Sequence, residues 1–198
     1  DVLPYFQKAE TYSRGGDAYR GEAGPLHTTT GTMKNPLYQA FIDAGLEAGY
    51  AKTEDVNGFQ QEGFGLMDMT VRGGVRSSTS NAYLKQALNR HNLHVSSGTV
   101  ASRVLFEEGR AVGVVYQQGS NEYRVIARRE VILSGGPIAS PKLLMLSGVG
   151  DASELADLGI DLVHHLPGVG KNLQDHLELY VQQECVQPIS LFSSLTPL

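Results

Sequence analysis

Asp175, His176 and Glu178 bring two carboxylates and an imidazole together within one short segment. If this segment is extended, His176 and Glu178 share one face, because side chains alternate along a strand, and Asp175 lies on the other. A histidine and a carboxylate on one face suit a site that binds a cation and manages a proton. The alternative is a solvated turn next to a glycine-rich stretch, and the residues alone leave both interpretations open.

A second candidate site lies upstream, where an apolar run meets a glycine turn and a helix. The apolar run at 131–133 predicts a short strand buried on both faces. Ser134-Gly135-Gly136 removes side-chain bulk at a sharp turn. Ser140-Pro141 predicts a helix start, with serine as the cap and proline as the first helical residue. Such a unit holds nucleotide cofactors in α/β proteins, but it also occurs as plain scaffold.

The sequence lacks the residue patterns that other kinds of functional site require. The 6 histidines include no pair at metal-ligand spacing with a third partner, so we predict no metal site. No P-loop, G-x-S-x-G elbow or poised cysteine occurs in the sequence. A net charge of −5 without a basic run argues against a nucleic-acid partner. No stretch approaches the roughly 20 apolar residues of a transmembrane helix.

Composition and pattern outline how the chain is organised. The 198 residues are 41% hydrophobic and 19% charged, which is ordinary for a soluble globular protein, and they could form one domain or a domain and a half. The chain starts without a methionine and stops without a clear end, so we expect an internal fragment of a longer protein. We expect a substrate-side and connecting part at 1–90, a cofactor-binding part at 91–175, and the start of a substrate-binding domain at 176–198.

Periodicity and turn signals predict the individual elements. Helices are expected over 2–12, 37–48, 78–88 and 151–158. Strands are expected over 67–71, 93–96, 101–106, 111–116, 122–127, 160–163 and 181–184. The three strands between 101 and 127 form a β-meander, and the helix over 37–48 has an apolar stripe of Leu37, Phe41, Ala44 and Ala48.

Two stretches give the chain a resemblance to a known family. The stretch at 136–150 has the Gly, Ser-Pro, paired aliphatic and Ser-Gly-aliphatic-Gly spacing of the second signature of the glucose–methanol–choline (GMC) flavin oxidoreductases. The stretch at 166–176 resembles another hallmark of that family at the expected distance. Residues 57–65, 67–70 and 175–178 are similar to the choline-oxidising members, especially the animal mitochondrial form. The resemblance covers nearly the whole chain.

The resemblance implies a fold and an activity. The fold is expected to be α+β or α/β, with an incomplete Rossmann-like FAD-binding layer, the β-meander, and part of an antiparallel-sheet substrate domain. The full protein is expected to bind FAD and to take a hydride from the alcohol carbon of choline, giving betaine aldehyde in the glycine betaine pathway. A quinone-type acceptor would receive the electrons. The alternatives are a GMC oxidoreductase acting on another alcohol and a truncated, non-catalytic product.

The resemblance also assigns roles to individual residues. His176 is expected to be catalytic, positioning the alcohol and stabilising alkoxide character as the hydride leaves. Glu178 is expected to lie against the trimethylammonium group, which a negative charge and aromatic faces can hold. Tyr180 is a second substrate-binding candidate, with core packing as its alternative role. The cofactor-binding residues are expected to be Ala101, Ser134, Gly135 and Asp175.

Parts of the family's machinery do not occur in this sequence. These are the N-terminal G-x-G-x-x-G that grips the pyrophosphate and the C-terminal histidine that acts as the base. We therefore expect residues 1–198 alone neither to hold FAD tightly nor to oxidise choline. By resemblance the protein belongs at the mitochondrial inner membrane, or in the bacterial cytoplasm or membrane if it is prokaryotic. Peripheral association with a membrane is compatible with that placement.

Overall fold

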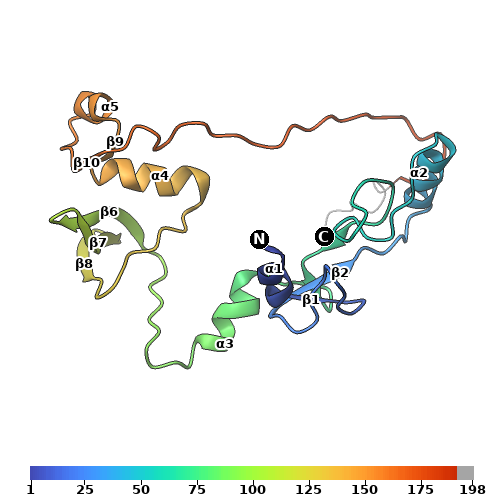
Figure 1. Ribbon diagram of the computed structural model, residues 1–198, viewed down its shortest axis with the longest axis horizontal. Helices are drawn as coiled ribbons and strands as arrows, with labels where there is room; N and C mark the ends of the chain where they lie inside the picture. Colours follow the sequence, from blue (N-terminus) through green and yellow to red (C-terminus); the bar gives the residue numbers. More distant parts are fainter. Residues whose placement is uncertain (191–198) are drawn as a thin grey trace. The chain divides into compact units, whose positions relative to one another are not determined.

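The computed structural model describes residues 1–190 and divides the chain into two compact units (Figure 1). Among the described residues, the first unit consists of 1–94 and 181–190, and the second consists of 95–180. The expected divisions were at 90 and 175. The substrate and cofactor roles assigned to these parts remain predictions. None of the helices within residues 1–190 is long and apolar enough to cross a membrane.

A three-stranded sheet forms the centre of the first unit. Its strands are β1 (Glu10–Tyr12), β2 (Leu26–Thr30) and β3 (Asp68–Met69), with β1 parallel and β3 antiparallel to β2. The preceding helix α1 (Leu3–Ala9) is shorter than the helix expected over 2–12. The reason is tertiary, because the chain becomes extended at Glu10 in order to pair with β2.

Helix α2 (Pro36–Glu47) begins where the sequence predicts, because the Asn35 side chain accepts the Leu37 N–H at 2.9 Å. Its buried face differs from the expected stripe, since Ile42 and Gly45 are buried whereas Phe41 is 68% exposed. The ring of Phe64 packs on Gly45 so closely that an added Cβ would lie 2.5 Å from it. A contact with a distant residue therefore selects the inward face of this helix.

The rest of the first unit is a hairpin followed by a helical segment. Strands β4 (Val71–Arg72) and β5 (Val75–Arg76) pair antiparallel, so the single strand expected over 67–71 is divided between β3 and β4. The helix expected over 78–88 consists of η1 (Ser80–Leu84), a π-helix, and α3 (Lys85–Ala87). Residues 93–96 form no strand, which corrects the prediction there.

The second unit contains the expected meander. Strands β6 (Val100–Glu107), β7 (Arg110–Gln118) and β8 (Asn121–Ile126) form one antiparallel sheet in that order. The turn between β6 and β7 uses Glu108 and Gly109 at positive φ, a region open to glycine and tolerated by few other residues. Helix α4 (Gly136–Leu146) packs against β6 (Figure 1).

Two predictions around α4 are wrong. The run at 131–133 is not a strand and is not buried on both faces, since Ile132 is 75% exposed. A buried parallel strand needs hydrogen-bonded neighbours, and none lies beside this run within residues 1–190. The helix begins at Gly136 instead of Ser140, with Pro137 in its first turn and Pro141 inside it.

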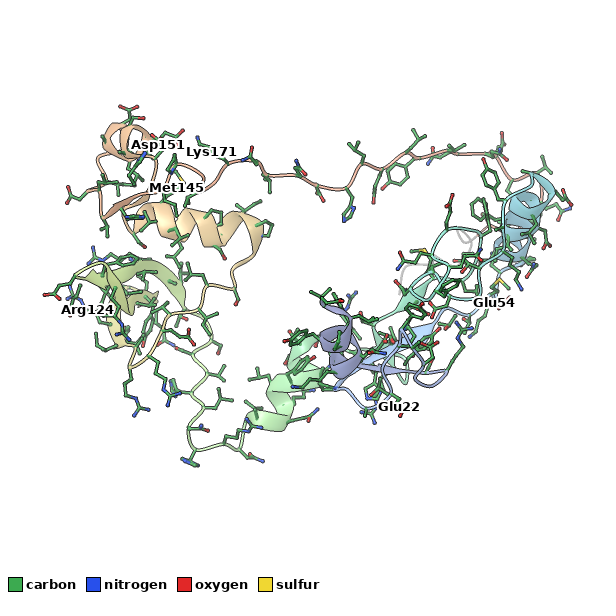
Figure 2. All side chains as sticks on the ribbon, in the orientation of Figure 1. Glu22, Glu54, Arg124, Met145, Asp151 and Lys171 are labelled. Atoms are coloured by element: carbon green, nitrogen blue, oxygen red, sulfur yellow. The ribbon has the colours of Figure 1, made fainter. Side chains whose placement is uncertain are left out.

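The end of α4 leads into a small α/β segment. Strand β9 (Val149–Gly150) pairs in parallel with β10 (His164–His165), so the strand expected over 160–163 lies slightly further on. Helix α5 (Ala152–Asp157) begins as predicted, because the Asp151 carboxylate accepts the N–H groups of its first turn. Figure 2 shows Met145, Asp151 and Lys171 gathered where these elements meet.

Candidate cofactor site

One hollow in the second unit brings together three of the residues expected to bind the cofactor. It has a volume of about 760 Å³, and Ala101, Ser134 and Gly135 all line it. One wall is the start of β6, a second is the chain at 131–135, and a third is the side of α4 that carries Leu143. The strand, the turn and the helix therefore converge on one space, although the residues just before the turn form no strand.

The β6 wall owes its shape to an irregularity in the strand. Ala101 pairs with Tyr116 of β7, and the register then shifts before Arg103 pairs with Val115. The Ser102 hydroxyl donates to the Val115 carbonyl oxygen at 3.1 Å across this shift. A bulge bends a strand and redirects its side chains, so this one determines which part of β6 faces the hollow.

The turn wall depends on small residues. The Gly135 N–H donates to the Ser140 hydroxyl oxygen at 2.9 Å, so Ser140 caps the turn from inside the helix and does not start it. A Cβ on Gly135 would lie 3.2 Å from the Cβ of Ala139. Gly136 has a φ of +84°, which glycine adopts readily. The backbone can therefore approach a bound molecule closely here.

The electrostatics of the hollow favour binding over acid–base chemistry. Among its lining residues Lys142 alone carries a charge, and most of the others are aliphatic. The first turn of α4 has backbone N–H groups without helical partners, which places partial positive charge at this end of the helix. Apolar walls suit a flat aromatic ring, and a helix amino terminus suits a phosphate. The residues present therefore fit a nucleotide cofactor.

The segment from Asp175 to Tyr180 is extended and exposed, and none of its residues lines this hollow. The Tyr180 hydroxyl donates a hydrogen bond to the Glu178 carboxylate, and this bond raises the pKa of Tyr180. The His176 N–H donates to the Asp175 carboxylate at 2.8 Å. The structure thus joins Glu178 to Tyr180, a pair that the sequence did not predict. Neither His176 nor Asp175 lines the hollow at Ala101, and their expected roles remain predictions.

The first unit contains an ion-pair cluster that the sequence analysis missed. Arg20, which is 4% exposed, lies 2.7 Å from the Glu10 carboxylate, 2.8 Å from that of Asp55 and 2.8 Å from that of Asp68. Its guanidinium carbon also lies 3.7 Å from the centre of the Tyr12 ring. The three acids lie 10, 35 and 48 positions away from Arg20 in the sequence. No local sequence pattern could therefore have revealed the cluster.

Charge pairing sets the protonation of this cluster. Burial raises the pKa of Glu10, but hydrogen bonds from Arg20, Thr28 and the Gly21 N–H outweigh it, and the net pKa is lowered. The pKa of Asp68 is lowered in the same way, with burial opposed by hydrogen bonds from Arg20 and other donors. Burial lowers the pKa of Arg20, yet the acids raise it overall. The pairing therefore favours the charged forms of Glu10, Asp68 and Arg20.

Within residues 1–190, no group of three or more His, Cys, Asp or Glu side chains has the arrangement of a metal site. The three acids around Arg20 are engaged by its guanidinium and by neighbouring hydroxyl and amide groups.

Comparison with known proteins identifies the family. Residues 1–178 match the family model described as GMC oxidoreductase. The chain is 58% identical to the mitochondrial choline dehydrogenase of Mus musculus over 196 residues, which are 99% of this chain and 33% of that protein. It is 54% identical to the oxygen-dependent choline dehydrogenase of Photobacterium profundum, over 98% of this chain and 35% of that protein. The chain thus spans about a third of the length of these relatives.

Solved structures show the same fold. Pyridoxine 4-oxidase from Mesorbium loti matches with a TM-score of 0.78 and 30% identity, over 84% of this chain and 33% of that one. An FAD-dependent oxidoreductase from Chaetomium thermophilum matches with a TM-score of 0.77 and 28% identity, over 84% of this chain and 32% of that one. Both the α+β architecture and its likeness to FAD-dependent enzymes are therefore shown.

Proposed function

Because the chain belongs to the GMC oxidoreductase family, we propose that it is part of an FAD-dependent enzyme that oxidises choline to betaine aldehyde. One observation carries this proposal. The likeness to choline dehydrogenases extends over 99% of the chain and so includes both the hollow at Ala101 and the segment that holds His176 and Glu178. The product would enter the formation of glycine betaine.

The hollow supplies the cofactor part of the proposal. Bound FAD would accept the hydride that leaves the alcohol carbon. Ala101, Ser134 and Gly135 would hold the nucleotide through their backbone and through the space left by their small side chains. The amino end of α4 and Lys142 would favour the negative charge of its phosphates.

The segment at 175–180 supplies the substrate part. A trimethylammonium group cannot donate an N–H hydrogen bond, so only negative charge and aromatic faces can hold it. Glu178 and Tyr180 offer one of each and are already joined by a hydrogen bond. His176 would donate a hydrogen bond to the alcohol oxygen and stabilise the negative charge that grows there. Asp175 would hold the start of this segment beside the cofactor.

The location of the enzyme is proposed from its relatives, whereas its electron acceptor is proposed from the family resemblance alone. A quinone-type compound is proposed as the electron acceptor. A mitochondrial location at the inner membrane is proposed from the mitochondrial relatives of mouse and human, with the bacterial cytoplasm or membrane as the location if the protein is prokaryotic. Peripheral attachment would be the means of any membrane association.

The direct test is to purify the full-length protein that contains this chain and to measure two properties. Its absorbance spectrum should show bound flavin, and choline should reduce a redox dye in its presence. Oxidation of an uncharged alcohol with a higher kcat/KM than choline would favour another GMC activity. A flavin-free protein that oxidises neither alcohol would favour a non-catalytic product.

A further inference from the structure

Ser147 lies directly after α4 and is buried, with 7% of its surface exposed. Its hydroxyl oxygen accepts the Val104 N–H at 2.8 Å and donates to the Leu143 carbonyl oxygen at 2.5 Å. The side chain is absent from the lining of the cofactor hollow. Ser147 thus uses its one hydroxyl donor and one of its two acceptor sites on backbone groups, one from a helix and one from a strand.

The strand contacted by Ser147 is an edge strand. In the order β6-β7-β8, one side of β6 has no neighbouring strand among residues 1–190, and the Val104 N–H is satisfied by the serine instead. This is also the one hydrogen bond from a side chain that joins α4 to β6 within the described residues. A single hydroxyl therefore supplies the side-chain hydrogen bond that supplements the packing of the helix on the strand.

The separation of α4 and β6 determines the width of the hollow. Ala101 lines it from β6, three residues before Val104, and Leu143 and Leu146 line it from the last turns of α4. The same two elements that Ser147 ties together thus form two of the three walls. A shift of α4 along or away from β6 would change the space between Ala101 and Leu143.

The residues after Ser147 prevent the helix end from adjusting. Gly148 has a φ of +83°, and a Cβ there would lie 2.4 Å from the Asp161 carbonyl oxygen. The Gly148 carbonyl oxygen accepts the Val163 N–H at 2.8 Å, and Val149–Gly150 pairs with β10. The end of α4 is therefore held on both sides, by the serine toward β6 and by its glycine neighbours toward β10.

We infer that Ser147 is a positioning residue, which holds β6 and α4 at the separation that the nucleotide cofactor in the hollow requires. The inference rests on the proposed function for the identity of the ligand. By this inference, the Ser-Gly-aliphatic-Gly end of the signature supports cofactor binding without touching the cofactor. Loss of the hydroxyl would leave the buried Val104 N–H without a partner, and the two walls would separate or tilt to let water reach it.

The test compares two serine variants of the full-length enzyme. Ser147→Ala should weaken FAD binding by about 10- to 100-fold, the range expected when a buried donor loses its partner. The matched control is Ser77→Ala in the first unit, where a buried serine accepts the His27 N–H at 3.1 Å. Both variants should lower the unfolding temperature, but Ser77→Ala should leave the FAD dissociation constant within about twofold of wild type.

The outcome that overturns the inference is an unchanged FAD dissociation constant in Ser147→Ala, since the serine would then serve stability alone. If this variant fails to fold, Ser147→Cys replaces it, because a thiol fills the same space but accepts hydrogen bonds weakly. Wild-type affinity in the cysteine variant would also overturn the inference.

Hydrogen exchange separates this inference from the proposed function. In Ser147→Ala without added cofactor, the amide of Val104 and its neighbours in β6 should exchange faster, whereas those of β8 should be unchanged. A wild-type protein that binds no FAD would overturn the proposed function and the ligand named here. Amide exchange in β6 of Ser147→Ala would then still show whether Ser147 couples the strand to the helix. The same exchange rates in this variant and in wild type would reject that coupling.

Discussion

Glu178 and Tyr180 are the residues proposed to bind the trimethylammonium group of the substrate. They lie two positions apart on an extended segment and are joined by a hydrogen bond between the tyrosine hydroxyl and the carboxylate. This arrangement leaves a negative charge beside an aromatic ring, the two groups that attract a quaternary ammonium ion. The preference for a positively charged substrate should therefore depend on Glu178.

Glu178→Gln in the full-length enzyme should raise the KM for choline by at least about tenfold, because the amide keeps the shape of the side chain but removes its charge. The KM for 3,3-dimethylbutan-1-ol, an uncharged analogue of choline, should change far less. Steady-state kinetics with both alcohols would measure this.

The control for this variant is Glu184→Gln, which removes an exposed carboxylate further along the same chain. It should leave both KM values unchanged. Equal increases for choline and for the uncharged alcohol in Glu178→Gln would contradict a cation-binding role for Glu178.

At the scale of elements, Arg20 holds the first unit together. It joins the strand that carries Glu10, the loop that carries Asp55 and the strand that carries Asp68. A guanidinium can do this because it presents several donors in a rigid plane. The glycine-rich loop at 14–25, which has no regular structure of its own, thus supplies the residue that ties its neighbours together.

Arg20→Met should destabilise the protein by about 3–5 kcal/mol, because it leaves three largely enclosed carboxylates without a counter-charge. Urea denaturation of the full-length protein, followed by circular dichroism, would measure the loss. The matched control is Lys171→Met, which breaks the exposed ion pair with Glu154 and should have no measurable effect. Equal stability of Arg20→Met and wild type would show that the cluster is dispensable.

The stability conferred by this cluster should depend on pH. The folded protein lowers the pKa of Glu10 and Asp68 below their ordinary values of about 4. A lowered pKa in the folded state adds stability that is fully present above the unfolded pKa and is lost as the pH falls through the folded pKa. Stability should therefore decrease as the pH is lowered from about 5 toward 2.

The same linkage predicts the behaviour of Arg20→Met. Its stability deficit relative to wild type should be largest near pH 7 and should shrink below about pH 4, where the acids take up protons. Unfolding measured at a series of pH values would show this convergence. A deficit that stays constant from pH 7 to pH 3 would mean that packing of the arginine stem, and not its charge, accounts for the loss.

At the scale of the whole molecule, the two proposed functional parts are incomplete in residues 1–190. The hollow at Ala101 is bordered by exposed residues such as Ile132, and the extended segment at 175–180 has no strand beside it. The chain spans 33% of the length of its mouse relative, and the glycine fingerprint for the pyrophosphate does not occur in its sequence.

Residues 1–198 expressed alone should therefore retain no FAD through gel filtration and should not reduce a dye with choline. The full-length protein is the control and should do both. Flavin absorbance of the purified chain measures the first property, and dye reduction measures the second. Bound flavin together with choline-dependent dye reduction by residues 1–198 would show that this part suffices.

Elements with local causes could be predicted from the sequence. Helices α2 and α5 start close to their predicted positions, because the caps that start them, Asn35 and Asp151, need only N–H groups two or three residues away. The meander was predicted from alternation and glycine turns, which are equally local. The family could also be predicted, since its signatures are continuous stretches of chain.

Features with distant causes could not be predicted. The buried face of α2 depends on the Phe64 ring, and the end of α1 depends on pairing with β2. The strand expected at 131–133 lacks a neighbour, and the partners of Arg20 lie 10 to 48 positions away.

For the candidate sites, residue types alone indicated the cofactor stretch and the pair of His176 and Glu178. The tertiary structure placed Ala101 beside Ser134 and Gly135 and assigned Ser147 to the join between α4 and β6. A motif is a property of neighbours in the chain, whereas a cavity or a buried hydrogen bond is a property of residues that folding brings together. For that reason the sequence determined the family, and the tertiary structure decided which residues line the candidate cofactor site.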